Sequence, residues 1–194
     1  MKRLVGVVLC ISVLTLALAV PAAAAVPTEV SGRWTDGRPI VPPVPVYAPR
    51  GGNCLVTIRF WHEWVDGSFR GRDETDFRIM AHGPCETCAP NVDRAKLKGT
   101  GTFEGDLCLG VWEDADCLGE MYSGSFDFVF EWQLTDPDPD PEGGDTFTGN
   151  LVILQGYDGF GDLRGVLEQW GRTGPTLVGG RVAYRGRVHV DPQP

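Results

Sequence analysis

Three glutamates, Glu63, Glu131 and Glu168, are the candidate acid–base groups of this sequence, with His62 and Tyr184 as partners. A carboxyl group transfers protons efficiently near neutral pH only where burial raises its pKa. If two of these groups met in a cavity, they would suit cofactor-free isomerisation or cyclisation of an apolar substrate. The alternation around Glu131 places it opposite a row of aromatic residues, and we expect all three glutamates on outer strand faces in solvent.

Five cysteines follow residue 25, and two of them form the sequence Cys85-Glu-Thr-Cys88. This spacing occurs in redox dithiols and in zinc sites. Gly83 and Pro84 precede the motif and Pro90 follows it, which is typical of a loop rather than of the helix start that a thioredoxin motif needs. A zinc site would need a second close pair, and Cys108 and Cys117 have eight residues between them. We therefore expect structural disulfides, no metal and no cofactor.

Cys108 and Cys117 are the expected disulfide pair, because they flank the short acidic segment LGVWEDAD between two strand-like runs. A bridge there closes a loop of about ten residues and would stabilise the fold by about 2 to 3 kcal/mol in the chain-entropy model. The pairing of Cys54, Cys85 and Cys88 stays open. The odd number of cysteines leaves one free thiol, for which Cys54 is a candidate.

Two segments are predicted to be loops. Residues 136 to 145, DPDPDPEGGD, resemble a calcium loop only in their acidity, because the glycine and terminal glutamate of an EF-hand loop are missing. We interpret them as a flexible acidic turn. Residues 39 to 50 hold five prolines, which remove backbone donors, and we interpret this insert as a surface loop.

The N-terminus has the pattern of a secretory signal peptide. Lys2 and Arg3 precede an apolar run from Leu4 to Val20, and a row of alanines leads to a cleavage site near Ala25. The alternative, a retained membrane anchor, is disfavoured by the alanine site and by the short apolar run. We expect removal of residues 1–25, secretion, and one domain over residues 26–194.

The mature chain is strongly acidic. Residues 1–25 contain two of the 17 basic residues and none of the 26 acidic ones, so 15 basic and 26 acidic residues remain and the formal net charge is −11. Such a surface repels nucleic-acid phosphates and anionic lipid headgroups. We predict no nucleic-acid partner and, after cleavage, no membrane partner; the oligomeric state stays open.

The clearest structural pattern lies in residues 123 to 134, where large apolar residues alternate with smaller or polar ones. Phe126, Phe128, Phe130 and Trp132 share one face, which predicts a strand with that face buried, either filling a core or contacting a ligand. Similar segments cover residues 28–35, 54–67, 68–83, 95–106, 146–155, 161–171 and 177–190. About eight such strands without a helical period predict a single antiparallel β-barrel, with a β-sandwich as the alternative.

Two glycine-spaced strings resemble a known family. Residues 159 to 165, GFGDLRG, are similar to the "G-x-G-x-L-x-G-L-x-G" ending of small bacterial proteins with an allene-oxide-cyclase-like barrel, and residues 98 to 105, KGTGTFEG, resemble that group's "G-x-G-x-F-x-G" strand. The resemblance covers about residues 94 to 188 and implies an eight-stranded barrel whose lumen takes a small apolar ligand. Most of the bacterial group has no assigned function, while the plant cyclases and some bacterial relatives are isomerases or cyclases. The family's catalytic residues do not align with this chain.

Two functions follow as hypotheses. The first is a secreted binding or structural barrel, whose lumen is filled by its own aromatic residues or holds one small hydrophobic molecule. The second is a cofactor-free isomerase or cyclase that acts on an apolar substrate in the lumen. A filled lumen would argue against the enzyme, and a hollow lumen with paired polar groups would favour it.

Overall fold

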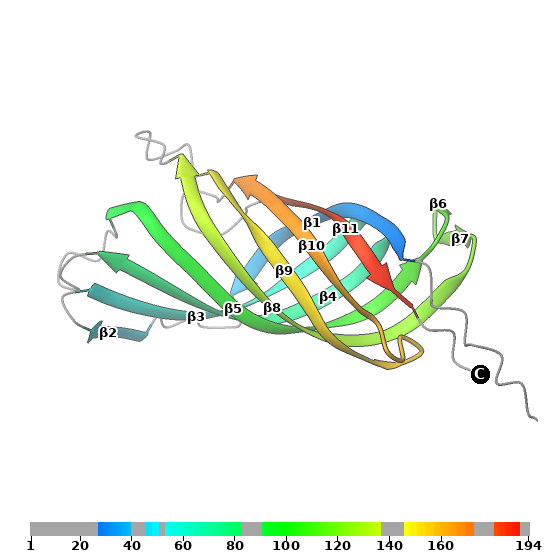
Figure 1. Ribbon diagram of the computed structural model, residues 1–194, viewed down its shortest axis with the longest axis horizontal. Helices are drawn as coiled ribbons and strands as arrows, with labels where there is room; N and C mark the ends of the chain where they lie inside the picture. The colour runs from blue at the N-terminus through cyan, green and yellow to red at the C-terminus, as the bar shows by residue number, and fades with distance from the viewer. Residues whose placement is uncertain are drawn as a thin grey trace, which may run out of the picture.

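The computed structural model describes residues 27–39, 46–50, 53–82, 91–136, 146–172 and 181–190. Within these residues, eight long antiparallel strands form one closed barrel (Figure 1). They are β1 (Thr28–Pro39), β3 (Asn53–Gly67), β4 (Phe69–His82), β5 (Asn91–Cys108), β8 (Met121–Asp136), β9 (Thr146–Asp158), β10 (Arg164–Arg172) and β11 (Arg181–His189). The predicted single barrel is confirmed, and the alternative β-sandwich is wrong.

The barrel closes because β1 pairs with strands at both ends of the sheet. The order is β1-β11-β10-β9-β8-β5-β4-β3, and β1 pairs with β11 along one edge and with β3 along the other. Gly67 sits at the β3–β4 turn with a φ of 111°, a conformation that favours glycine. A glycine turn of this kind joins two neighbouring antiparallel strands directly.

The proline-rich segment differs from the prediction. Residues 46 to 50, expected to be part of a surface loop, form the strand β2 (Val46–Arg50), which pairs with the N-terminal part of β3. In this pairing Pro49 lies opposite Cys54. Proline is tolerated there because β2 is an edge strand, whose outer side needs no ladder donors. Residues 40–45 lie outside the described residues.

Several predictions fall on residues that the structure does not describe. They are the signal peptide in residues 1–25, Cys85 and Cys88, and residues 137–145 of the acidic loop. The described residues contain no helix long and apolar enough to cross a membrane.

The aromatic face of β8 points into the barrel, as its alternation predicts. Phe126, Phe128, Phe130 and Trp132 are all buried. Glycines on the neighbouring strand β5 make room for them: Gly99 and Gly101 lie opposite Phe130 and Phe128, and a Cβ atom at either glycine would overlap the facing ring. These glycines therefore allow large rings to fill the interior.

One end of the barrel is plugged by the turn between β9 and β10. In this turn Leu163 N–H donates to the carbonyl of Phe160 at 2.9 Å, which directs both side chains inward. Phe160 and Leu163 join Phe69, Leu107 and Val188, and all five are 0% exposed. The string that carries the family resemblance thus closes the barrel; we call this the plugged end and the opposite one the far end.

The predicted disulfide is confirmed. Cys108 is bonded to Cys117 with a Cα–Cα distance of 5.7 Å, and the bond holds a small hairpin of β6 (Val111–Glu113) and β7 (Asp116–Leu118) against the end of β5. The guanidinium of Arg70 lies over the ring of Trp112 at 4.3 Å and adds a second contact to the hairpin. A disulfide is compatible with a location outside the cytoplasm.

Candidate functional site

A buried hydrogen-bond cluster centred on Asp73 lies inside the barrel. The carboxylate accepts hydrogen bonds from Trp64 Nε1 at 2.6 Å and from Thr75 Oγ1 at 2.6 Å, and His62 Nδ1 lies 2.8 Å from the same group. His62 and Asp73 are direct partners in the β3–β4 pairing. Since an ionised carboxylate can only accept, His62 donates from Nδ1, and in the neutral ring Nε2 carries the lone pair.

The strand pattern that puts Asp73 inside was visible in the sequence, but its importance was missed. On β4 the inward row runs through Phe69, Gly71, Asp73, Thr75 and Phe77. A carboxylate in such a row is unusual, because burying a charge without partners is costly. The outer row of β4 carries several further charged residues, and only the register with His62 identifies the partner of Asp73.

A second polar pair lies in the same interior. Trp132 Nε1 donates to Gln169 Oε1 at 2.7 Å, and Gln169 is 1% exposed. An indole N–H can only donate, so the amide atom of Gln169 that it contacts must be the oxygen Oε1. The nitrogen Nε2 is then the other end of the amide group. Gly149, opposite Trp132, permits the contact, because a Cβ atom there would overlap the indole.

Trp34 connects the two polar groups. Its ring lies edge-on to His62, with the centroids 4.3 Å apart, and its centroid is 5.6 Å from that of Trp132. Two buried donors of this region, Trp34 Nε1 and Gln169 Nε2, have no acceptor among the described residues. We call His62, Asp73, Trp34, Trp132 and Gln169 the interior cluster.

The three candidate glutamates all lie on the outer face of the barrel, as expected. Glu131 pairs with Lys98 at 2.7 Å, and Glu168 pairs with Arg185 at 2.9 Å. The hydrogen bond from Lys98, helped by its charge, lowers the pKa of Glu131. This shift is opposite to the one a general acid needs. Glu63 is exposed as well.

Tyr184, the remaining candidate, is buried, and its hydroxyl already makes a structural hydrogen bond. Its hydroxyl accepts the backbone N–H of Phe69 at 3.0 Å, and burial raises the pKa of the phenol well above its ordinary value. The phenol therefore stays protonated at neutral pH. It lies beside Trp64 at a centroid distance of 5.0 Å, toward the plugged end.

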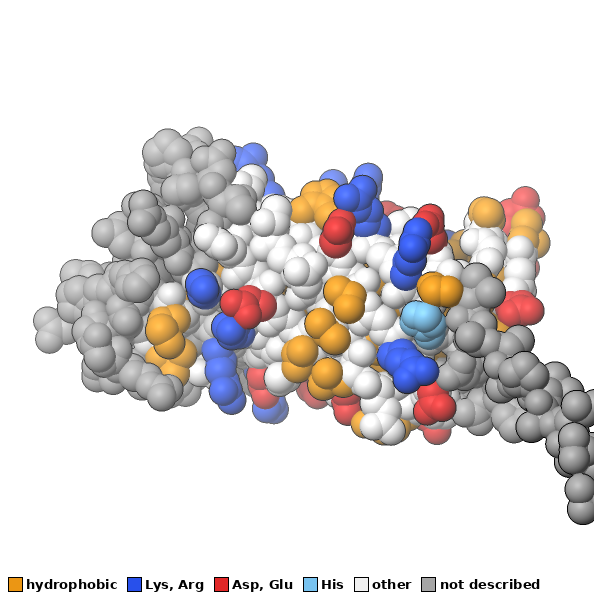
Figure 2. Space-filling model, viewed as in Figure 1, with side chains coloured by type: hydrophobic (Ala, Val, Ile, Leu, Met, Phe, Trp, Pro, Cys, Tyr) orange, Lys and Arg blue, Asp and Glu red, His pale blue; other side chains and the backbone are white. Residues whose placement is uncertain are grey.

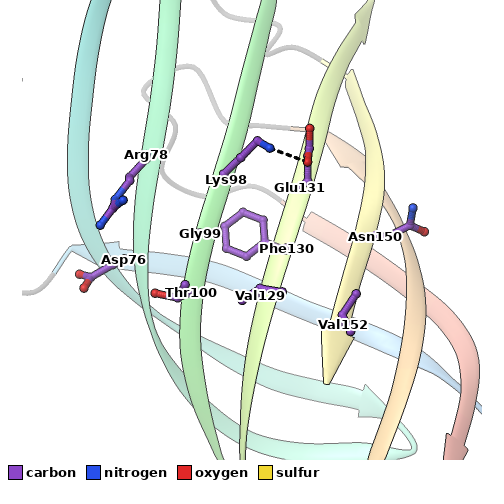
Figure 3. Close-up of a pocket in the computed structure, with 10 residues that line it drawn as sticks. All are labelled: Asp76, Arg78, Lys98, Gly99, Thr100, Val129, Phe130, Glu131, Asn150 and Val152. Carbon is purple, nitrogen blue, oxygen red and sulfur yellow. Dashed lines mark ion pairs between the residues drawn. The ribbon is translucent and has the colours of Figure 1, made fainter. Parts of the chain in front are cut away.

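The outer face carries a hollow over β4, β5, β8 and β9, whose lining is drawn in Figure 3. Its charged groups include two ion pairs: Lys98 with Glu131, shown by the dashed line, and Asp76 with Arg59 at 2.7 Å. Figure 2 shows similar mixed charges around a small apolar group. Val152, Leu154 and Val166 are exposed apolar residues of β9 and β10. Such a surface is ordinary for a folded protein, and the interior cluster is the better candidate site.

Comparison of the chain with protein-family models finds no match, and comparison with curated proteins finds none either. Within the described residues, no group of three or more His, Cys, Asp or Glu side chains is placed to hold a metal ion. The interior cluster combines an oriented imidazole, aromatic walls and two N–H donors that have no acceptor among the described residues.

Proposed function

We propose that this protein is an exported β-barrel that binds one small, mainly apolar ligand at the interior cluster. The observation that carries the proposal is the pair of unsatisfied donors, Trp34 Nε1 and Gln169 Nε2. A buried N–H without an acceptor costs about 1 to 3 kcal/mol, so native proteins rarely keep one without a compensating role. An acceptor atom of a ligand would satisfy either group.

The cluster is buried: Trp34 and Trp132 keep 4% of their surface exposed and His62 keeps 5%. The plugged end is closed by Phe160 and Leu163, so we expect a ligand to enter from the far end. The surrounding rings would stack on a flat apolar body. The ligand must be small, because these rings already approach each other to centroid distances between 4.3 and 5.6 Å.

Export and family membership are part of this proposal. The N-terminal pattern of Lys2, Arg3, an apolar run and the alanines up to Ala25 supports secretion, and the Cys108–Cys117 bond agrees with it. The closed eight-stranded barrel, together with the glycine strings at 98–105 and 159–165, supports a relation to the allene-oxide-cyclase-like group. The acidic mature chain supports the expectation that neither nucleic acid nor membrane lipid is a partner.

The first test is native mass spectrometry of the mature protein from its own secretion medium, compared with its denatured mass. We expect a small organic adduct that is lost on denaturation. Protein freed of any adduct is then titrated with 2-tetralone, a flat apolar ketone with one acceptor oxygen. Binding is measured by the change in tryptophan fluorescence.

Trp34→Phe and Gln169→Leu should each weaken binding of 2-tetralone about fivefold, the equivalent of one hydrogen bond of about 1 kcal/mol. Trp170→Phe is the matched control, because Trp170 lies on the outer face of β10 and is 42% exposed. Absence of both an adduct and millimolar binding of the ketone would refute ligand binding and leave a structural barrel.

A further inference from the structure

We infer that the outer face of the barrel carries a second binding site, for a small ligand in which a carboxylate is attached to a six-membered ring. The site is an open hollow of about 490 Å³ over β1, β9, β10 and β11, toward the far end of the barrel. Arg33, Arg172 and Arg181 line it together with Trp170. It lies outside the barrel and is independent of the interior cluster and of the ligand proposed there.

The arginines of the hollow include two like charges on neighbouring strands. Arg172 and Arg181 are direct partners in the β10–β11 pairing, and both are exposed. Side chains at such positions have Cβ atoms about 4.5 to 5.5 Å apart, and like charges there destabilise a sheet. Arg33 adds a third charge from β1, because its partner on β11 is Ala183, two residues from Arg181 on the same face. A carboxylate bound among these groups would reduce their repulsion.

Several arginines elsewhere on the outer face are paired with acidic side chains. Examples are the ion pairs Arg59–Asp76, Arg72–Glu104 and Arg187–Glu29. Within the described part of the chain, no acidic residue lines the hollow, and none forms an ion pair with Arg33 or Arg181. Acidic residues outnumber basic ones in this sequence, so a hollow with arginines alone is opposite to what the composition favours. An anion from outside would supply the partner.

Trp170 gives the hollow a flat apolar wall. Its side chain is 42% exposed, and its partner on β11 is the small residue Ala183, which also lines the hollow. The guanidinium of Arg185, held by Glu168 at 2.9 Å, lies 5.5 Å from the centroid of the indole. A six-membered ring can stack on an exposed indole, while a carboxylate on that ring binds a guanidinium through two parallel hydrogen bonds. The hollow therefore offers both contacts to one ligand.

The surroundings of the hollow favour a small anion over a large one. Its volume lies within the range of about 300 to 1,000 Å³ that is usual for small-molecule sites. The net negative charge of the chain repels long polyanions, whereas a single carboxylate interacts mainly with the nearest arginines, since charges more than about 8 Å apart are largely screened at physiological ionic strength. Acidic sugars and aromatic acids share the required ring and carboxylate, so both are tested.

Binding is measured by proton–nitrogen correlation NMR of the isotope-labelled mature protein, with the indole N–H signal of Trp170 as the probe. Trp170→Phe lacks this signal and therefore assigns it. Sodium glucuronate and sodium benzoate are titrated separately, with methyl glucoside and benzyl alcohol as their uncharged counterparts. We expect at least one acid to shift the signal with a Kd of about 1 mM, and about 0.5 M NaCl to weaken this binding about threefold. A shift with glucuronate alone identifies an acidic sugar, and a shift with benzoate alone identifies an aromatic acid.

Arg33→Gln and Arg181→Gln should each weaken binding of the responding acid about fivefold, the upper range for an exposed ion pair. Arg78→Gln is the matched control, because it removes the same charge from an exposed arginine on β4, which lines the other hollow. It should leave the affinity within about twofold, since exposed charges at a distance are screened. Arg181→Gln should fold at least as stably as the original protein, because it removes a like charge opposite Arg172.

Three results would overturn this site: no shift with either acid, an equal shift with the uncharged counterparts, or equal weakening by Arg78→Gln and Arg181→Gln. None of them bears on the interior cluster, whose test uses the uncharged 2-tetralone. Trp170→Phe remains a suitable control there, because phenylalanine keeps an aromatic face on the outside of β10.

Discussion

At the scale of single residues, Tyr184 shows how one hydroxyl joins strands that are not neighbours in the sheet. Its oxygen accepts the N–H of Phe69 at the start of β4, which is separated from β11 by β1 and β3 across the closure. The phenol crosses β1 at Gly32, where a Cβ atom would overlap the hydroxyl. The pair of residues therefore stabilises the place where the barrel closes.

Tyr184→Phe should lower the free energy of unfolding by about 1 to 3 kcal/mol at pH 7, because the buried N–H of Phe69 loses its acceptor. Urea denaturation followed by circular dichroism measures the change. Tyr157→Phe is the control: Tyr157 is 40% exposed and its hydroxyl donates to Asp127 on the surface, so its effect should stay within about 0.5 kcal/mol. Equal effects of the two substitutions would contradict the role given to Tyr184.

The same substitution has a defined pH dependence. Burial raises the pKa of Tyr184 in the folded state above the ordinary value of 10.0. The unfolded chain then loses this proton first, so the stabilisation is fully present below pH 10 and decreases as the pH rises above it. The stability difference between the original protein and Tyr184→Phe should narrow between pH 10 and pH 11, and a constant difference would argue against burial of the phenol.

At the scale of elements, the β6–β7 hairpin depends on its disulfide more than on packing. Val111 and Leu118 face each other across it and are 69% and 58% exposed. The hairpin thus buries little apolar surface of its own. Its position is maintained by the bond between Cys108 and Cys117 and by the contacts of Arg70 with Trp112 and with the carbonyl of Asp114.

Replacement of both Cys108 and Cys117 by serine should lower the free energy of unfolding by about 2 to 3 kcal/mol, the chain-entropy value for a loop of about ten residues. The midpoint of urea denaturation gives the change. Arg70→Met, which keeps the length of the side chain and removes its charge, is the comparison and should have a smaller effect. Unchanged stability of the double serine variant would show that the bond contributes nothing to the fold.

At the scale of the whole molecule, closure makes the first and last strands depend on each other. β1 pairs with β11 on one side and with β3 on the other, so neither of its edges is free along the barrel. Loss of β11 would expose the edges of β1 and β10 and remove Val182, Tyr184 and Val188 from the core. Unpaired edges also favour association between molecules.

Deletion of residues 181–194 should therefore abolish the cooperative thermal transition seen by near-ultraviolet circular dichroism, which reports the packing of the interior tryptophans. Deletion of residues 191–194 alone is the control and should leave the transition within about 2 °C, because it removes no residue of β11. A truncated protein that kept the original near-ultraviolet spectrum would show that closure is dispensable.

The strand pattern of this protein was determined by the sequence alone, because side chains on a strand alternate with a period of two. That rule placed Phe126, Phe128, Phe130 and Trp132 inside and Glu131 outside. The Cys108–Cys117 bond could also be predicted from the sequence, because a short loop between strands brings its two ends together whatever the rest of the fold is.

Only the tertiary structure decided which inward side chains meet. His62 and Asp73 are brought together by the β3–β4 register, and Trp132 reaches Gln169 across 37 residues of sequence because Gly149 leaves space. β2 likewise is a strand because its backbone pairs with the edge of β3. Alternation specifies the face on which a residue lies, but register, closure and curvature specify its neighbours, and these depend on pairings between distant segments that no local pattern encodes.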